Sequence, residues 1–300
     1  NKSNMQTETI KIQKDEFEKY DQFLLDQGFG AVSDPNPYMF GKYKKDGTYI
    51  SIYTSGKVVV QGLNISSIVQ SLNGFNGLGG VGVQGGGIDE SFIPHIGADE
   101  VGKGDFFGPL IVCAAYVSTE NLSLLKGLGV TDSKKISDKR IAEIYNQIQE
   151  KILYRVWTLN PVEYNERILK AKNIALVLAE LHGDNIKEFV RELSNRGIEY
   201  NKIVIDQFSS NKGRLAKHLS QYNMEQFHQA ESKDITVAMA SIIARYYFIQ
   251  AMKTMSEKYD MVFPYGATHV IDAGKEFLKT YGEKELVNVA KLNFKTVSQL

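Results

Sequence analysis

A glycine-rich segment divides this chain of 300 residues into two unequal parts. Eight of the fourteen residues in Gly74–Gly87 are glycine. Such a stretch loses a large amount of backbone entropy when it becomes ordered, so we expect a flexible linker over residues 73–92. The chain is therefore expected to fold as two domains, one in residues 1–72 and one in residues 93–300.

The same segment contains a formal match to the dinucleotide-binding fingerprint, at Gly77–Gly82. That fingerprint requires a strand before its first glycine and a helix that begins at its last. No strong strand pattern precedes Gly77, and no helical pattern begins at Gly82. We therefore interpret these glycines as part of the linker and not as a nucleotide site.

The first domain has an α+β pattern. Residues 6–13 alternate like a strand, and apolar residues at helical spacing predict a helix over 17–25. Three further apolar segments predict an antiparallel meander with turns at Asp46–Gly47 and Ser55–Gly56, and residues 65–72 are expected to close the domain as a helix.

This predicted sheet is rich in tyrosine and lysine. Such a face is either an ordinary solvated surface or a platform for a nucleic-acid backbone, and the composition alone does not choose between them. The residues concerned are Tyr38, Lys42, Tyr43, Lys44, Lys45, Tyr49, Tyr53 and Lys57.

The second domain alternates strands and helices, which predicts an α/β fold. Residues 95–100 and 110–117 are expected to form a hairpin of strands. An amphipathic helix follows over residues 136–152, residues 202–206 form a short buried strand, and a long helix begins at Asp234.

Four acidic residues of this domain stand at strand ends or at a helix entry. They are Asp99, Glu100, Asp206 and Glu231. If they converge, they form a cage of hard oxygen ligands that suits Mg²⁺ or Mn²⁺ and phosphodiester chemistry. Adjacent strand residues point to opposite faces, so Asp99 and Glu100 share one metal only if the chain bends there. Each acid taken alone is equally well a solvated strand end or a turn residue.

The fourth position has a competitor. Asp234 lies three residues after Glu231 and is typical of a helix N-cap. We favour Glu231 as the site residue, on the match to a known family given below.

Basic residues lie beside the acids. Gly102, Lys103 and Gly104 expose backbone N–H groups next to a cation, which suits a phosphate or a sugar. Ser133 and Lys134 belong to a hydroxyl- and lysine-rich loop before the amphipathic helix; a solvated helix start is the alternative interpretation.

Composition excludes several other classes. The formal net charge is zero, so a phosphate-binding surface must be local. Cys113 is the only cysteine, which excludes a disulfide within the chain and a cysteine-based zinc site. The five histidines show no paired ligand spacing, and no Gly-x-Ser-x-Gly motif occurs. No apolar run approaches the ~18 residues of a membrane span, and the polar N-terminal residues lack a signal-peptide core, so a cytoplasmic protein is expected.

Several motifs together resemble the type 2 ribonucleases H. They are IGADEVGKGDFFGPLIVCAAYV, GVTDSKKIS, VIDQF and AESKDITVAMASIIAR, which occur in this order, and the resemblance covers residues 94–300. Lysine between the two glycines resembles the ribonuclease HIII branch. The resemblance implies a ribonuclease H-like domain with a mixed sheet flanked by helices. It also implies an N-terminal α+β domain similar to the TATA-box-binding protein, although the long glycine segment departs from the usual tighter junction.

The resemblance implies endonucleolytic cleavage of the RNA strand in RNA–DNA hybrids. Asp99, Glu100 and Asp206 match the first three carboxylates of the family, and the string around Glu231 matches the fourth. The Gly102–Gly104 loop matches the loop that contacts the RNA 2′-hydroxyl, and Ser133 and Lys134 are further expected substrate contacts.

The expected mechanism uses two metal ions, Mg²⁺ or Mn²⁺, ~3.5–4 Å apart, and yields 5′-phosphate and 3′-hydroxyl ends. The expected partner is the hybrid alone, for a monomer with no membrane or protein partner. Two alternatives stay open: a carboxylate-metal nuclease or recombinase-like enzyme acting on DNA, and a hybrid-binding protein with a vestigial site.

Overall fold

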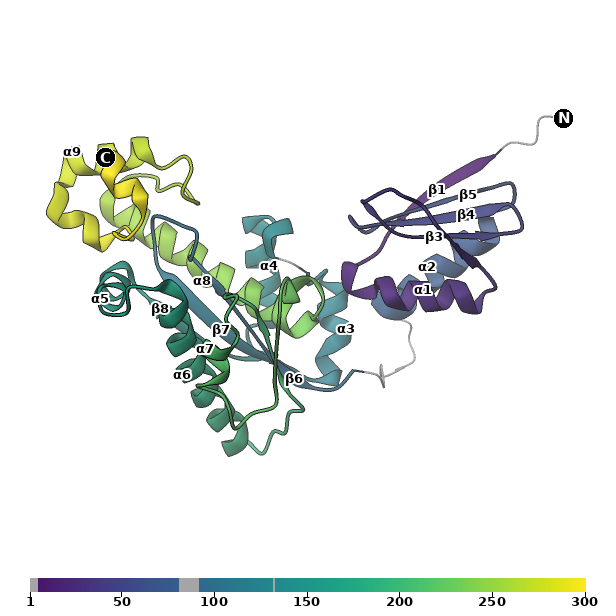
Figure 1. Cartoon of the computed structure of the whole chain (residues 1–300), viewed down its shortest axis with the longest axis horizontal. Helices are drawn as coiled ribbons and strands as arrows, with labels where there is room; N and C mark the ends of the chain where they lie inside the picture. Colours follow the sequence, from purple (N-terminus) through teal and green to yellow (C-terminus); the bar gives the residue numbers. More distant parts are fainter. Residues whose placement is uncertain (1–4, 81–91, 132) are drawn as a thin grey trace. The chain divides into compact units, whose positions relative to one another are not determined.

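The computed structural model describes residues 5–80, 92–131 and 133–300. The chain divides into two compact units with a boundary between residues 88 and 89, and the short segment 123–129 is grouped with the first (Figure 1).

The first unit is a five-stranded antiparallel sheet with two helices. Its strand order is β1-β5-β4-β3-β2. The elements are β1 (Gln6–Lys11), the short 3-10 turn η1 (Lys14–Glu16), α1 (Phe17–Asp26), β2 (Gly30–Val32), β3 (Met39–Lys45), β4 (Thr48–Tyr53), β5 (Lys57–Gly62) and α2 (Ser66–Gly80). The expected strand, helix and meander are present, and β2 is an addition that the sequence pattern did not indicate.

Helix α2 corrects the predicted start of the linker. It extends to Gly80 and so includes residues 73–80, while residues 81–91 of the predicted linker lie outside the described residues. Phe75 explains the extension, because its ring stacks on Phe23 at 4.5 Å and meets Tyr20 edge-on at 4.8 Å. This packing outweighs the low helix propensity of the neighbouring glycines.

One face of the first sheet is its core. Ile50, Ile52, Val58 and Val60 are buried with side chains of α1 and α2. Strand alternation places the residues between them on the opposite face, where Lys42 and Lys44 lie 5.6 and 5.3 Å from the ring of Tyr49.

Two residues of the predicted tyrosine- and lysine-rich face lie elsewhere. Tyr43 is buried, and its hydroxyl donates to Asp21 at 2.6 Å. Lys45 donates to the carbonyl of Gln27 at 2.6 Å, on the helical side. They share strand β3 with Lys42 and Lys44 but have the other parity, so the sheet face holds only part of the predicted set.

The second unit has a mixed sheet of order β10-β9-β6-β7-β8. Strands β10, β9 and β6 are mutually parallel, while β7 and β8 run antiparallel to their neighbours. The strands are β6 (His95–Val101), β7 (Leu110–Val117), β8 (Leu153–Leu159), β9 (Ile203–Asp206) and β10 (Met224–Phe227). The predicted hairpin is β6–β7, and the expected mixed sheet is confirmed.

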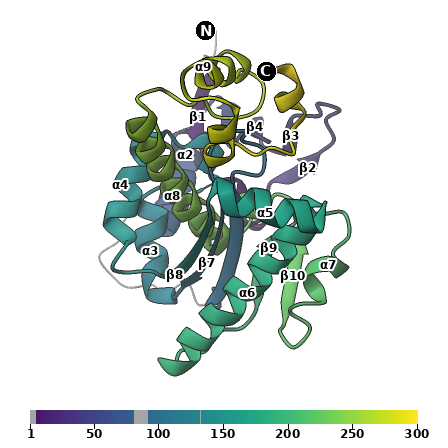
Figure 2. The same ribbon diagram turned by 90° about the vertical axis from the view of Figure 1, so that its left-hand side faces the viewer.

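Helices cover both faces of this sheet (Figure 2). Helix α8 (Ile235–Tyr259) packs on β6 and β7 together with α4 (Asp138–Ile148), and α6 (Ile174–Asn195) packs on the other face with α5 (Pro161–Ala171). The remaining elements are α3 (Thr119–Gly127), η2 (Ser133–Lys135), α7 (Gly213–Ala216), η3 (Ala230–Ser232), α9 (Ile271–Tyr281), η4 (Glu283–Asn288) and η5 (Lys295–Gln299).

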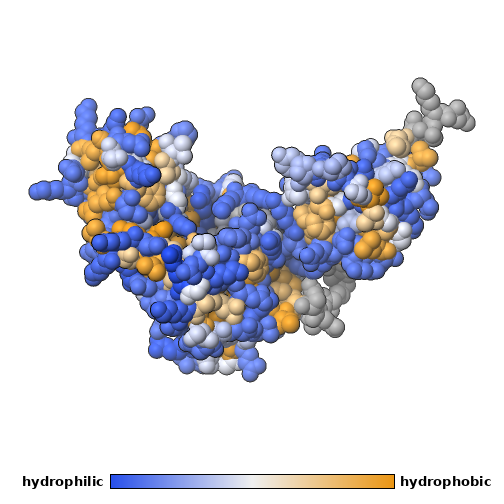
Figure 3. All heavy atoms as spheres, viewed as in Figure 1, coloured by the Kyte–Doolittle hydropathy of each residue, from blue (hydrophilic) through white to orange (hydrophobic). Residues whose placement is uncertain are grey.

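Helix α8 is long and apolar enough, by length and composition, to cross a membrane. This differs from the expectation, drawn from the sequence, that no apolar run approaches the length of a membrane span. However, 67% of its most apolar window is buried inside the protein, as in the core helix of a globular domain. On the face that Figure 3 shows, one group of hydrophobic residues lies over α9 and the C-terminus, and smaller groups lie on other parts of the molecule.

Candidate active site

Three of the four predicted acids converge. Asp99, Asp206 and Glu231 each offer one carboxylate oxygen, and these oxygens lie within 4.8 Å of one another. The sheet brings the first two together, because β6 and β9 are adjacent parallel strands in which Ala98 pairs with Ile205. The next residue of each strand is an aspartate, so both side chains lie at the same level of the sheet.

A close contact between the start of α8 and strand β6 positions Glu231 near the two aspartates. It lies in η3, just before α8. At Gly97 of β6, a Cβ atom would lie 2.4 Å from the backbone of Thr236 and Val237. Only glycine allows the start of α8 to approach β6 this closely, and the approach places Glu231 beside Asp99.

Asp234 has a different role. Its Oδ1 accepts hydrogen bonds from the backbone N–H groups of Thr236 at 2.9 Å and Val237 at 3.1 Å, as a helix N-cap does. Its Oδ2 contacts Nε2 of His95 at 2.6 Å. The carboxylate cluster therefore contains Glu231 and not Asp234.

Glu100 does not join the other three as the predicted cage requires. Strand β6 continues through this residue without bending, so Glu100 points to the face opposite Asp99. There its Oε2 contacts Nε2 of His182 at 2.9 Å, a fully buried residue of α6. Glu100 still lines the same cavity as the three clustered acids. His182 orients this carboxylate, and no spacing in the sequence had pointed to it.

The cluster is electrostatically strained. Burial raises the pKa of Asp99 well above its usual range, and the nearby Glu100 and Asp206 raise it further. Burial, then a hydrogen bond and the charge of Glu231, raise the pKa of Asp206 to about 7. Glu231 is only 5% exposed, and its Oε2 has no hydrogen-bond partner among the described residues. Cations in the cavity would relieve this repulsion.

The cavity has a volume of about 380 Å³. It brings together all nine residues that the sequence predicted, and it adds others from β6, α8 and the loops between. Its lining is Asp99, Glu100, Val101, Gly102, Lys103, Gly104, Asp105, Ser133, Lys134, Asp206, Glu231, Ser241, Arg245 and Gly266.

The glycine–lysine loop forms one wall of this cavity. Gly102 has a φ of +99°, and a Cβ atom there would lie 2.1 Å from the carbonyl oxygen of Pro109. Both the backbone conformation and the lack of space therefore exclude a side chain at this position. Lys103 donates to the carbonyl of Phe208 at 3.0 Å, which ties the loop to the segment after β9. Gly104 has open space around its Cβ position.

Helix α8 contributes two residues that the sequence interpretation missed. Ser241 shares a hydrogen bond of 2.6 Å with the predicted Ser133. Arg245, four residues later on the same helical face, lies 4.8 Å from the ring of Tyr265 and donates to Asp138 at 3.4 Å. The spacing of four residues between Ser241 and Arg245, which places both on one face of a helix, was the feature of the sequence that could have indicated them. Asp132, in the predicted hydroxyl-rich loop, lies outside the described residues.

The raised carboxylate pKa predicts a pH-dependent stability of the metal-free protein. The folded pKa of Asp206 is about 7, against 3.8 for the free side chain, so the folded state retains a proton that the unfolded state releases. The contribution of Asp206 to the free energy of unfolding is greatest below about pH 4 and is lost as the pH rises through about 7. Thermal unfolding in chelator should thus occur at lower temperature at pH 8 than at pH 5.5, and Mg²⁺ or Mn²⁺ should reverse the loss at pH 8. An unchanged melting temperature on metal addition would contradict this.

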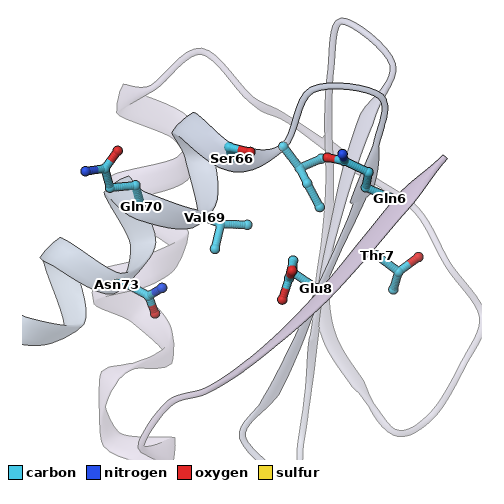
Figure 4. A pocket seen from close by; sticks show the side chains of 8 residues that line it. Gln6, Thr7, Glu8, Ser66, Val69, Gln70 and Asn73 are labelled. Carbon is cyan, nitrogen blue, oxygen red and sulfur yellow. The ribbon is translucent and has the colours of Figure 1, made fainter. Parts of the chain in front are cut away.

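A second hollow, of about 600 Å³, lies in the first unit between β1 and α2. In Figure 4, Glu8 and Val69 face the space between strand and helix, with Gln70 and Asn73 farther along α2. Its lining has one carboxylate and no cationic side chain, so it lacks the convergent charges of the first cavity.

Comparison with known proteins of similar sequence identifies the family of this chain. A family model described as Ribonuclease HII matches residues 96–297, and one described as a domain of unknown function (DUF3378) matches residues 7–76. Proteins named Ribonuclease HIII from Protochlamydia amoebophila and Staphylococcus haemolyticus are each 35% identical, over 94% and 91% of this chain and 93% and 91% of the relatives. The chain belongs to the ribonuclease HIII family.

A solved structure supports the fold of this chain. The crystal structure of Bst-RNase HIII in complex with Mn²⁺ matches with a TM-score of 0.66 and 27% identity, over 98% of this chain and 97% of that one. The match includes both units, so the expected fold class is confirmed.

Proposed function

We propose that this protein is a metal-dependent endonuclease that hydrolyses the RNA strand of RNA–DNA hybrids in the cavity around Asp99, Asp206 and Glu231. The observation that carries the proposal is the convergence of three carboxylates from three separate elements into one cavity, in a chain of the ribonuclease HIII family. Its similarity to Bst-RNase HIII, which was crystallised with Mn²⁺, supports a divalent cation as cofactor.

The residues present fit Mg²⁺ or Mn²⁺. Carboxylate oxygens are the ligands these cations prefer. Glu231, whose buried Oε2 has no hydrogen-bond partner among the described residues, clusters with acids whose pKa values are raised. Asp99, Asp206 and Glu231 would hold the ions, with Glu100 at the edge of the same cavity. When bound, two such ions supply an activated water and stabilise the negative charge on the departing 3′-oxygen.

The other residues of the cavity bind and orient the substrate. The backbone of Gly102–Gly104 approaches the sugar, where contact with a 2′-hydroxyl separates RNA from DNA. Ser133, held by Ser241, and Lys134 bind the phosphate backbone, as does Arg245, which Asp138 and Tyr265 orient. The products carry a 5′-phosphate and a 3′-hydroxyl.

The outer face of the first sheet supplies additional affinity for the backbone of the hybrid. Lys42 and Lys44 flank Tyr49 on that face, where phosphates and bases meet cations and an aromatic ring. This interaction compensates for the zero net charge of the chain.

Two consecutive lysines provide a matched test of this face. Lys44→Ala should weaken hybrid binding several-fold and reduce the slope of log affinity against log salt by about 1, because one phosphate contact is lost. Lys45→Ala should leave both unchanged, because Lys45 is bound on the helical side. Fluorescence anisotropy over a salt series measures both quantities. Equal effects of the two substitutions would remove the sheet from the binding surface.

The deciding experiment for the activity is cleavage of an end-labelled RNA–DNA hybrid with Mg²⁺, Mn²⁺ or chelator. Single-stranded RNA and duplex DNA serve as comparison substrates. Metal-dependent cuts in the RNA strand of the hybrid alone are expected. Cleavage of duplex DNA would favour a DNA nuclease, and tight hybrid binding by folded protein without cleavage would favour a binding protein.

We also propose that the enzyme acts in the cytoplasm and as a monomer. The residues of one chain are enough to line the cavity, which supports the monomer. Light scattering of the free protein is expected to show a single monomeric species.

A further inference from the structure

A fully buried lysine lies outside the residues assigned to the reaction. Lys291, in the segment between η4 and η5, is 0% exposed. Its Nζ donates to the carbonyl oxygens of Asp105 at 2.7 Å and Gly108 at 2.6 Å, and it lies 3.5 Å from that of Phe107. Three carbonyl acceptors match the three N–H donors of a protonated ammonium group.

All three acceptors belong to one loop, residues 102–108, which we call the substrate loop. Its first part, Gly102–Asp105, lines the catalytic cavity, and its last part runs into β7. Lys291 lies 186 positions after Asp105 in the sequence, and its ammonium group nevertheless binds the backbone of this loop.

The backbone around Lys291 reinforces the contact. The N–H of Lys291 donates to the carbonyl of Phe106 at 2.9 Å, and the N–H of Gly108 donates to the carbonyl of Val289 at 2.9 Å. On the far side, Asn165 of α5 accepts from the N–H of Leu292 at 2.9 Å. The substrate loop is therefore clamped to a segment that is itself fixed to a helix.

The charge at this position is costly. Burial lowers the pKa of Lys291 to about 7, although nearby Asp105 favours the charged form. A methionine of similar length would fill the same space without that desolvation penalty. The ammonium therefore serves the geometry of the loop and is not explained by the packing of the core.

We propose that Lys291 is a positioning residue that holds the substrate loop in the conformation required for binding the sugar of the RNA strand. This inference rests on the proposed function, in which the backbone of Gly102–Gly104 contacts the substrate. Without the ammonium, the loop samples other conformations, and the affinity for substrate falls while the carboxylate cluster stays intact.

The test compares Lys291→Met with Val289→Ala in the full-length protein. Both change a fully buried side chain of the same segment, but Val289→Ala leaves every contact of the Lys291 ammonium in place. With a labelled hybrid, Lys291→Met is expected to raise KM by about tenfold or more, with kcat within about threefold of the unsubstituted enzyme. Val289→Ala is expected to lower the melting temperature without changing KM.

Amide hydrogen exchange gives a readout that does not depend on activity. In Lys291→Met, the amides of Phe106 and Gly108 should exchange about tenfold faster or more, while those of β7 keep their protection. In Val289→Ala, any loss of protection should not be confined to the loop.

The outcomes separate the two proposals. If the unsubstituted enzyme does not cleave the hybrid, the proposed function fails, while the exchange experiment still decides the role of Lys291. If it cleaves, and folded Lys291→Met keeps its KM or Val289→Ala raises KM equally, the inference about Lys291 is overturned. If Lys291→Met does not fold, Lys291→Gln replaces it. If neither variant folds, hydrogen exchange is measured in the unsubstituted enzyme. The amides of Phe106 and Gly108 are then expected to be as protected as those of β7. Rapid exchange at Phe106 and Gly108 would overturn the inference.

Discussion

Asp99→Asn is expected to abolish hybrid cleavage, with a loss of at least ~10³-fold in kcat, while hybrid binding persists. Asp99 belongs to the carboxylate cluster, and an amide keeps the shape of its side chain but removes the charge that a cation requires. The same substitution should raise the melting temperature of the metal-free protein at pH 8. The reason is that burial, Glu100 and Asp206 all disfavour the ionised form of Asp99.

Single-turnover cleavage, fluorescence anisotropy and thermal unfolding in chelator measure the three effects. The control is Asp184→Asn, on an exposed position of α6, which should change none of them. A folded Asp99→Asn enzyme that cleaves at the original rate would refute the assignment of the cluster as the active site. Loss of folding would show that Asp99 is structural.

Glu231→Gln and Asp234→Asn should differ sharply, although the two positions are three residues apart. Glu231→Gln is expected to reduce cleavage by ~10²-fold or more and to weaken Mn²⁺ binding, because this carboxylate belongs to the cluster. Asp234→Asn should keep cleavage within about tenfold, because asparagine also caps helices well.

The second variant should instead lose stability. Asp234 contacts His95 at 2.6 Å, and its carboxylate raises the pKa of that imidazole against the opposing effect of burial. Removal of the charge should cost about 1 kcal/mol of unfolding free energy at pH 6. Denaturant unfolding and calorimetric titration with Mn²⁺ measure the two properties. A larger loss of cleavage in Asp234→Asn than in Glu231→Gln would reverse the assignment.

Much of this site was predictable because its chemistry is concentrated in short strings. Asp99, Asp206 and Glu231 each stand in a local context that predicts a strand end or helix entry, and the order of the motifs resembled one family. Residues that act through the backbone, such as Gly102 with its positive φ, were also visible as part of a glycine–lysine string.

Side-chain partners across the fold were not predictable in this way. The pairing of Glu100 with His182 depends on the packing of α6 against the sheet. The placement of Tyr43 and Lys45 on the helical side, where Tyr43 is buried and Lys45 is exposed, depends on the register of β3. Glycine content suggested a linker where the packing of Phe75 instead continues a helix.

The amino-acid sequence by itself determined the family, the α/β and α+β character of the two parts, and the identity of the acids, because hydrophobic periodicity and catalytic motifs are local properties of the chain. Only the tertiary structure decided which acids share one cavity, that Asp234 contacts His95, and that Lys291 reaches the substrate loop. These depend on strand register and on contacts between residues more than a hundred positions apart, which no local pattern encodes.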